Sequence, residues 1–261
     1  MLNAFRKLYR HRALLFATIS QSMHSRFTGN ILGGLWLVLY PLLFLLMYAA
    51  VFVYILKVRM PGLGTADYIL VIFSGLVPFL AFSEAFGTGT MSIVANRGLL
   101  RNTLFPIELV VARDVIVGHA SMGLGMLLVW GSALYAGGFY WTHLAVPFIY
   151  ALQIVMTLGI VWITSTLTVF FRDLQQATPI LILFLMLVSP IAYTDEMVPE
   201  EMKGLLQLNP LAWLMHLYRA CLLNGTLPVH DLVVLSAFSI VLFMLGHRLI
   251  SRLKALFPDY V

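Results

Sequence analysis

Residues 188–225, VSPIAYTDEMVPEEMKGLLQLNPLAWLMHLYRACLLNG, alternate short apolar clusters with polar breaks. Four carboxylates and three prolines interrupt the segment, the prolines being Pro190, Pro199 and Pro210. None of its apolar pieces is long enough to cross a bilayer, which takes about 20 mostly apolar residues in a helix. Long apolar runs lie on both sides of it. The fold therefore depends on how this broken segment fits between two apolar runs.

The composition places the whole chain in a membrane. Of its 261 residues, 61% are hydrophobic and 10% are charged, whereas a soluble domain carries about 25% charged residues. The mean hydropathy is +0.94. In a membrane protein the basic residues behind the net charge of +5 indicate which loops lie in the cytoplasm. The charge therefore does not indicate a nucleic-acid partner. The single cysteine, Cys221, excludes an internal disulfide.

Apolar runs of spanning length occur along the chain. Five runs reach or nearly reach the length of a spanning helix, at residues 34–56, 68–87, 115–135, 144–171 and 232–250. A sixth run, 177–194, is about one helical turn short. We therefore predict an all-α membrane protein with six transmembrane helices. Small residues on two of the runs, among them Gly118 and Gly159, predict close contact between helices.

The distribution of basic residues predicts the orientation. Twelve of the 16 Lys and Arg residues lie before the first run, in the second and fourth connections or at and after the end of the last run, and four lie in the other connections. Basic loops stay in the cytoplasm, so both termini are predicted to be cytoplasmic. The apolar run at 13–19 has only seven residues and no small-x-small site follows it, so we expect no cleaved leader.

The first 30 residues predict an amphipathic helix on the membrane surface. They are basic, and apolar residues recur at helical spacing: Phe5, Leu8, Phe16, Ile19 and Met23. Such a helix lies in the interface with its apolar face toward the lipid. A basic tail that only fixes the topology is the alternative.

The chain shows none of the motifs that an ATPase or a membrane enzyme needs. The G-x-x-x-x-G-K-[ST] phosphate loop is absent, and the seven histidines form no His-x-x-x-His pair. We therefore predict no catalytic residue and no metal site. Glu84 is the exception to the lack of charge inside the predicted spans. An intramembrane carboxylate is a candidate functional group, but we expect Glu84 to lie at the interface or to pair with a neighbour.

The cytoplasmic connection between the second and third runs, residues 91–114, contains a short predicted helix at 97–105. Asn96 would be its N-cap and Pro106 would end it. Three leucines would project from it: Leu99, Leu100 and Leu104. Exposed leucines on a short helix suit a groove on another protein. A connector that only lies on the membrane surface is the alternative.

Several motifs, in order along the chain, underlie a family resemblance. They are SRFTGNILGGLWLVLYPLL (25–43), NRGLLRNTLFPIE (96–108), FFRDLQQ (170–176) and SPIAYTDEMVPE (189–200) followed by NPLAW (209–213). Over its whole length, as one domain of residues 1–261, the chain resembles the membrane subunit of ATP-binding cassette exporters of the ABC-2 type. It is most similar to the branch that exports lipid-linked polysaccharides (O-antigen, capsule and teichoic acid) across the bacterial inner (plasma) membrane.

The resemblance implies roles for two segments. The 91–114 connection would hold a coupling helix that docks on an ATPase through Asn96, Arg97, Leu99, Leu100, Arg101, Leu104, Phe105 and Pro106. Residues 195–228 would form re-entrant helices that dip into the outer leaflet, where protein or water must cover irregular backbone. The outer gate would contain Pro190, Tyr193, Pro199, Asn209, Pro210, Tyr218 and Arg219. An ordinary outer loop with an amphipathic helix is the alternative.

A polymer passage follows from the same resemblance. Aromatic residues recur every four positions on the first span: Trp36, Tyr40, Phe44 and Tyr48. Their faces suit weak, repeated contact with sugars, and a packing stripe that faces lipid or core is the alternative. A lipid-linked substrate would carry a pyrophosphate, for which the candidate contacts are Arg10, Arg12 and Arg26. The same arginines would also hold the N-terminus inside.

The resemblance further implies a homodimer of this chain with two nucleotide-binding ATPase subunits. ATP and Mg²⁺ would bind the ATPase, and this chain would hold no cofactor. The expected cargo is lipid-linked polysaccharide, with O-antigen favoured by the segments FFRDL and YTDEMVPEEM. Two alternatives stay open: an ABC-2 permease for a drug or small lipid, and a membrane pore or enzyme that works without an ATPase. The role of Arg172 and Asp173 also stays open.

Overall fold

The structure is a computed structural model, and it describes residues 6, 8–55, 64–98, 106–193, 198, 201, 204, 206 and 208–260. Each of the elements within these residues is helical, which confirms the all-α prediction for this part of the chain. In chain order they are α2 (Arg12–Phe27), η1 (Gly33–Leu35), α3 (Trp36–Ala50), η2 (Val51–Ile55), α4 (Thr65–Thr90), α5 (Ser92–Ala95), α7 (Ile107–Gly137), η3 (Trp141–Ala145), α8 (Val146–Phe170), α9 (Leu174–Val188), α11 (Pro210–Leu222), α12 (Val229–Leu253) and α13 (Phe257–Tyr260).

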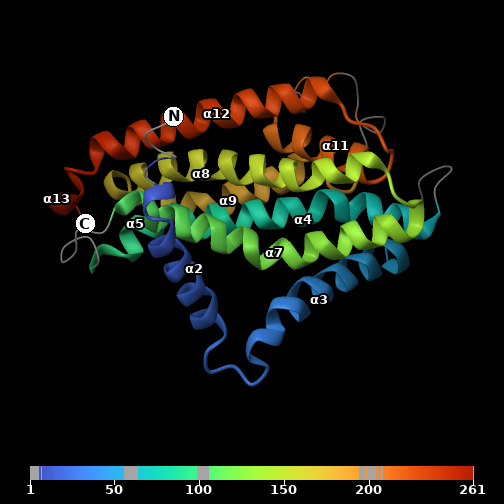
Figure 1. Cartoon of the computed structure of the whole chain (residues 1–261), viewed down its shortest axis with the longest axis horizontal. Helices are drawn as coiled ribbons and strands as arrows, with labels where there is room; N and C mark the ends of the chain where they lie inside the picture. The colour runs from blue at the N-terminus through green and yellow to red at the C-terminus, as the bar shows by residue number, and fades with distance from the viewer. Residues whose placement is uncertain are drawn as a thin grey trace.

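The long helices α4, α7, α8 and α12 run along the long axis of the molecule (Figure 1). Five segments are long and apolar enough to cross a membrane: Gly33–Ala50, Thr65–Thr90, Ile107–Gly137, Trp141–Phe170 and Val229–Leu253. Each overlaps one of the five long predicted runs, so those spans are confirmed as apolar helices.

The first and the shortest predicted spans differ from expectation. The first changes from an α-helix to the π-helix η2 after Ala50 instead of continuing as one helix. The shortest, α9, has 15 residues and therefore rises about 22 Å, less than the ~30 Å of a hydrocarbon core. A sixth span through α9 stays a prediction.

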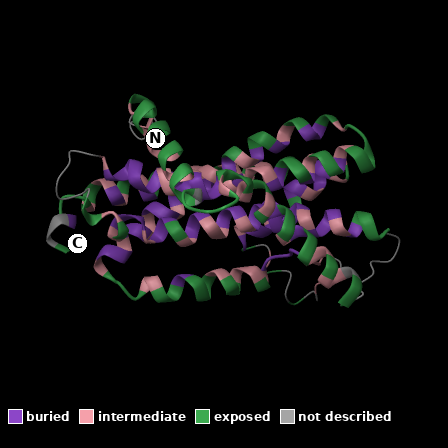
Figure 2. Cartoon of the chain, turned by 90° about the horizontal axis from the view of Figure 1, so that it is seen from below, coloured by how far each residue is buried: buried purple, intermediate pink, exposed green. Residues whose placement is uncertain are grey.

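Helix α4 is the centre of the bundle. In its most apolar window 72% of the residues are buried, compared with 22% in α12 and 11% in the first span. The helix is apolar on all sides, as a helix surrounded by protein must be, and α7, α8, α9 and α11 pack around it. Figure 2 shows the buried residues concentrated in these central helices. By contrast, Pro41 and Leu45 are the buried residues of α3, and the rest of that helix is half-buried or exposed.

Small residues allow the closest helix approaches. A Cβ atom on Gly118 of α7 would lie 2.6 Å from Cα of Ala85 in α4. A Cβ atom on Gly159 of α8 would lie 2.5 Å from the carbonyl carbon of Leu242 in α12. Both neighbours are backbone atoms, so only glycine fits at either position. The predicted close contacts at Gly118 and Gly159 are confirmed.

The two ends of the bundle are built differently. Helices α5 and α13 lie at one end, and α11 with η3 lies at the other (Figure 1). At the α5 end, Glu108 in the first turn of α7 is 2% exposed and pairs with Nζ of Lys254 at 3.1 Å. Lys254 directly follows α12. This pair ties the end of α12 to the first turn of α7, which lies within residues 91–114.

Candidate functional site

A cavity of about 1150 Å³ lies between α2, α3, α4, α7 and α9. Its lining combines apolar, aromatic and charged side chains: Arg26, Gly29, Asn30, Ile31, Leu32, Trp36, Leu37, Tyr40, Pro41, Leu80, Ser83, Glu84, Ser121, Met122 and Ile182. Tyr40 lines the cavity and is still 53% exposed, and Ile31 is fully exposed. The cavity therefore opens to the surface between α2 and α3.

The shape of the cavity follows from a sharp turn in the chain. Helix α2 crosses the bundle steeply, and α3 returns along it, so that the two form a V (Figure 1). The turn between them contains Gly29 at φ +87° and Gly33 at φ +47°. Residues with side chains rarely adopt such positive φ values. The GNILGG sequence thus allows the reversal that encloses one side of the cavity.

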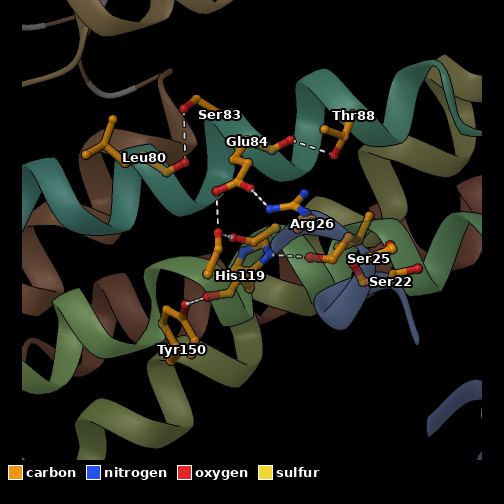
Figure 3. Close-up of polar contacts among 12 residues, drawn as sticks. Ser22, Ser25, Arg26, Leu80, Ser83, Glu84, Thr88, His119 and Tyr150 are labelled. Carbon is orange, nitrogen blue, oxygen red and sulfur yellow. Dashed lines mark hydrogen bonds and ion pairs between the residues drawn. The ribbon is translucent and has the colours of Figure 1, made fainter. Parts of the chain in front are cut away.

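A charged pair lies in the cavity wall. Arg26, in the last turn of α2, forms an ion pair with the Glu84 carboxylate of α4. Ser121 of α7 donates a hydrogen bond to the other carboxylate oxygen of Glu84 (Figure 3). The Arg26 and Glu84 side chains are 30% and 24% exposed. The expectation that Glu84 pairs with a neighbour is confirmed, and the pair joins α2 to the central helix.

The polar contacts continue beneath the pair. Tyr150 of α8 donates its hydroxyl to the His119 carbonyl of α7 at 2.6 Å, two residues before Ser121 (Figure 3). The His119 ring packs edge-on against Tyr150, with ring centroids 5.7 Å apart. These contacts hold α7 against α8. They fix the helix that presents Ser121 to Glu84.

The predicted aromatic stripe divides into two parts. Trp36 and Tyr40 line the cavity. Phe44 and Tyr48 are half-buried, stack with a centroid distance of 5.3 Å, and pack against the hydrophobic core. The packing interpretation thus fits Phe44 and Tyr48, whereas Trp36 and Tyr40 lie at the cavity. Its role in transport stays a prediction.

The structure separates the three arginines predicted to contact a pyrophosphate. Arg26 lines the cavity. Arg12 lies 14 residues earlier on the same helix, which is about 21 Å along its axis, and its guanidinium lies 4.4 Å from the centroid of the Tyr9 ring. Arg10 is exposed outside the cavity. Only Arg26 among them therefore lies close to the charged and aromatic lining.

Most of the predicted outer-gate residues gather where α9 ends and α11 begins. The Asn209 side chain accepts a hydrogen bond from the Leu211 amide at 3.0 Å, which caps α11 directly before Pro210, and donates one to Ser189 Oγ at 3.0 Å. Tyr193 donates its hydroxyl to the Val188 carbonyl at 2.7 Å. Pro199 lies outside the described residues, as does most of the first predicted re-entrant helix.

Arg219 of α11 holds this outer segment together. Its guanidinium donates hydrogen bonds to the carbonyl oxygens of Pro190 at 2.5 Å, Ile191 at 2.7 Å and Tyr193 at 3.0 Å. A further bond reaches the Val71 carbonyl of α4 at 3.3 Å. A guanidinium is suited to this role because it carries five fixed donors. One side chain thus joins α11, α4 and the chain that follows α9.

A second polar link connects α11 to the bundle core. Gln153 of α8 is fully buried, donates to the Pro78 carbonyl of α4 at 2.8 Å and accepts from the Tyr218 hydroxyl of α11 at 3.0 Å. Pro78 lies inside α4, where proline interrupts the backbone hydrogen bonds. Tyr218 and Arg219 are neighbours in the sequence, so two consecutive residues attach α11 to the central helices.

Replacing Gln153→Leu is expected to destabilise the purified chain by about 1–2 kcal/mol, because it leaves the Tyr218 hydroxyl and the Pro78 carbonyl without their partner. Tyr218→Phe should cost less, and the double variant should cost less than the sum. Thr157→Val is the matched control, since its hydroxyl bonds only the Gln153 backbone of its own helix at 2.8 Å. The free energy of unfolding of the three variants and the control is measured by detergent unfolding followed by tryptophan fluorescence. Strictly additive losses in the double variant would show that the two side chains act independently.

The first residue of the predicted coupling segment, Asn96, is hydrogen-bonded to α5 and α7. Asn96 ends α5, donates to the Ser92 carbonyl at 2.8 Å and accepts from Arg113 of α7 at 3.3 Å. Arg97 is helical, and Pro106 directly precedes α7. The predicted residues between them lie outside the described residues: Leu99, Leu100, Arg101, Leu104 and Phe105. Docking on an ATPase therefore stays a prediction.

Several residues of the site were not predicted from the sequence. Ser121 was not selected as a site residue, and the pairing of Arg26 with Glu84 joins positions 58 residues apart. The buried pair of Glu108 and Lys254 was also missed. The one available signal for Glu84 was its charge inside an apolar run, which identified the residue but not its partner.

The bundle of apolar helices is typical of a multi-pass membrane protein, and it contains an open, partly charged cavity. The chain belongs to the ABC-2 type transporter family, whose model matches residues 13–223. The resemblance based on the sequence motifs is thereby confirmed.

Relatives cover the full chain. The chain is 28% identical over 252 residues to the O-antigen export system permease protein RfbA of Klebsiella pneumoniae, and the match spans 94% of each chain. The protein of the same name from Myxococcus xanthus is 28% identical and is matched over 100% of both chains. The polysialic acid transport protein KpsM of Escherichia coli is 29% identical over 88% of this chain and 89% of KpsM.

Proposed function

We propose that this chain is the transmembrane subunit of an ATP-driven exporter that moves a lipid-linked polysaccharide, most specifically O-antigen, out of the cytoplasm across the inner membrane. Two copies pair, and two ATPase subunits bind them at the α5 end, where both termini face the cytoplasm. The similarity to O-antigen and polysialic acid transport proteins supports the cargo class. The observation that carries the proposal is the cavity, which holds Arg26, Trp36 and Tyr40 together.

The cavity lining matches the three chemical parts of a lipid-linked glycan. The guanidinium of Arg26 suits a phosphate group, since paired hydrogen bonds to charged oxygens are the strong ones. Trp36 and Tyr40 offer flat faces to the apolar C–H sides of sugar rings. Apolar residues such as Leu80, Met122 and Ile182 line the rest of the cavity and suit a hydrocarbon chain.

The energy for export comes from the partner in this proposal. The chain has no phosphate loop, so ATP and Mg²⁺ bind the ATPase and this chain holds no cofactor. The coupling segment of residues 96–106 receives the motion of the ATPase. The two ends of this segment are held in place, because Asn96 and Arg113 bond to each other and Glu108 pairs with Lys254. Motion at the loop therefore reaches α7 and α12 directly.

The outer end provides the exit. Residues 195–228 form re-entrant helices, of which α11 is the second, and α9 crosses as a sixth, shortened span. Arg219 and Asn209 hold α11 against the end of α9, so the outer gate of each copy moves as one unit. The polymer passes between the two copies along their first spans.

The subunit composition tests the proposal. The chain is co-expressed with the ATPase encoded beside it, and the detergent-extracted complex is weighed by native mass spectrometry. We expect two copies of each subunit. A variant with Leu99→Asp, Leu100→Asp and Leu104→Asp should lose the ATPase and remain a membrane protein, because carboxylates do not enter an apolar groove.

Leu256→Asp is the matched control, since Leu256 is 45% exposed beyond α12 and outside the coupling segment. It should retain the ATPase. A stable chain that never binds an ATPase would overturn the exporter proposal in favour of a pore or an enzyme. Deleting the chain in its host should leave lipid-linked polysaccharide on the cytoplasmic side; unchanged surface polysaccharide would shift the cargo to a drug or a small lipid.

A further inference from the structure

We propose that Glu84 is an internal substitute for the substrate phosphate: it binds Arg26 while the cavity is empty and releases it when a phosphate group enters. The exchange frees the end of α2 from α4 and so couples occupancy of the cavity to the position of α2. This inference rests on the proposed function, since it assigns a regulatory step to the same cavity.

The geometry places the exchange inside the cavity. Arg26 and Glu84 both line it, and they come from different helices. Each side chain is about a quarter to a third exposed, 30% for Arg26 and 24% for Glu84, so an incoming group can reach both. An ion pair buried without access would hold the helices together permanently. Because this pair lies in an accessible wall, a phosphate group can replace the Glu84 carboxylate on Arg26.

The charges favour the exchange. A guanidinium binds carboxylates and phosphates with the same hydrogen-bond geometry, and a phosphate ester offers more charge and more acceptor oxygens than a carboxylate. After the exchange Glu84 retains the hydrogen bond from Ser121, which comes from α7 and does not depend on α2. The displaced carboxylate therefore does not lose all its partners. Its own charge then repels the bound phosphate, which limits affinity and favours onward release.

The fold allows α2 to respond. Apart from its packing on α7, α2 reaches the central helix α4 through this pair. The turn that follows it contains Gly29 and Gly33 at positive φ. Glycine imposes the fewest limits on backbone rotation, so this turn can act as a hinge. Release of Arg26 would widen the V between α2 and α3.

The direction in which each substitution changes the affinity for a pyrophosphate separates this role from a merely structural ion pair. The probe is farnesyl pyrophosphate, added to the chain and its ATPase in phosphatidylcholine nanodiscs, with the dissociation constant measured by calorimetry. Glu84→Gln removes the internal competitor and should tighten binding about fivefold, the effect of losing one partly exposed ion pair. Arg26→Gln removes the phosphate contact and should weaken binding at least about tenfold. Arg26→Lys should fall between wild type and Arg26→Gln.

A structural pair predicts a different pattern, because losing either partner would loosen the same contact. Both variants would then weaken binding, and that result would overturn the proposal. Arg248→Gln, an exposed position on α12, should leave binding unchanged. Hydrogen exchange of the unaltered chain gives a test that needs no variant. Farnesyl pyrophosphate should speed exchange of the α2 amides, and slower or unchanged exchange would contradict the release of α2.

The source of the phosphate is tested in parallel. Farnesol and farnesyl monophosphate show how much of the affinity belongs to the pyrophosphate. Nanodiscs of phosphatidylglycerol offer an ordinary lipid phosphate instead; if they abolish farnesyl pyrophosphate binding, the occupant is bulk lipid and the regulatory assignment fails. An unaltered chain that never binds an ATPase would refute the proposed function, and the same binding comparison on the chain alone in nanodiscs would still test the role of Glu84. The two failures are therefore distinguishable.

Discussion

Export is expected to fall at least about tenfold when Arg219→Gln replaces the guanidinium of α11. The side chain donates hydrogen bonds to four carbonyl oxygens, three of them in residues 190–193 and one in α4. Hydrogen bonds to charged groups contribute about 1.5–3 kcal/mol each, and under the proposed re-entrant arrangement little water is present to replace them. Glutamine cannot span the same four acceptors. The segment after α9 should therefore separate from α11, and the measurement is surface polysaccharide from a strain that carries only the variant.

The control for this prediction is a variant that loses a different arginine and is compared at the same amount of protein in the membrane. Arg252→Gln removes an exposed arginine at the end of α12, so it should export normally. Arg219→Lys retains the charge with fewer and differently directed donors, and intermediate export is expected. Hydrogen exchange of residues 188–193 should rise in Arg219→Gln. Full export together with unchanged protection there would show that Arg219 does not organise the outer segment.

Replacing Gly159→Leu should abolish the folded chain. A Cβ atom at this position would lie 2.5 Å from the Leu242 carbonyl carbon and 2.6 Å from the Phe243 amide nitrogen, so α8 and α12 must move apart. The obstacle is the backbone of α12, which no rotamer change relieves. The cost should exceed the about 1–3 kcal/mol that extra methylenes usually cause in a core. Size-exclusion chromatography of the extracted variant should show aggregate instead of a single peak.

Gly131→Leu is the matched control on α7, because no atom lies within 4 Å of a Cβ placed there. It should elute like the unaltered chain. Gly159→Ala should already lower the melting temperature, since the Cβ atom alone makes the contact. A monodisperse Gly159→Leu variant would mean that α12 packs on α8 less closely than the structure shows.

The spans could be predicted because they depend only on local sequence. An apolar run of sufficient length must form its backbone hydrogen bonds within itself, so the runs at 68–87 and 144–171 correspond to α4 and α8. The small residues Gly118 and Gly159 also indicated close packing at positions where the structure shows it. The shortened helix α9 was likewise foreseen as about one turn short, although its path through the membrane stays a prediction.

The site was only partly predictable because its contacts are long-range. Arg26 and the aromatic pair Trp36 and Tyr40 were selected from charge and spacing, and the structure places them in one cavity. Nothing in the local sequence indicates that Glu84 meets Arg26 across 58 positions. The four carbonyls around Arg219 carry no sequence signal at all, since every residue has one. Arg10 and Arg12 matched the same charge criterion and lie elsewhere.

The opening of the cavity between α2 and α3 determines what an amphiphile must give up to enter it. A closed pocket would require the whole hydrocarbon tail to leave the bilayer, at about 0.8 kcal/mol for each methylene exposed to water. Under the proposed function, a side opening beside the exposed first span lets most of the tail remain among lipid tails, while the polar head and the adjoining carbons enter the cavity. The total length of the lipid carrier would then hardly affect affinity. Carriers of different length would be loaded equally well, and discrimination would rest on the head group and the carbons next to it.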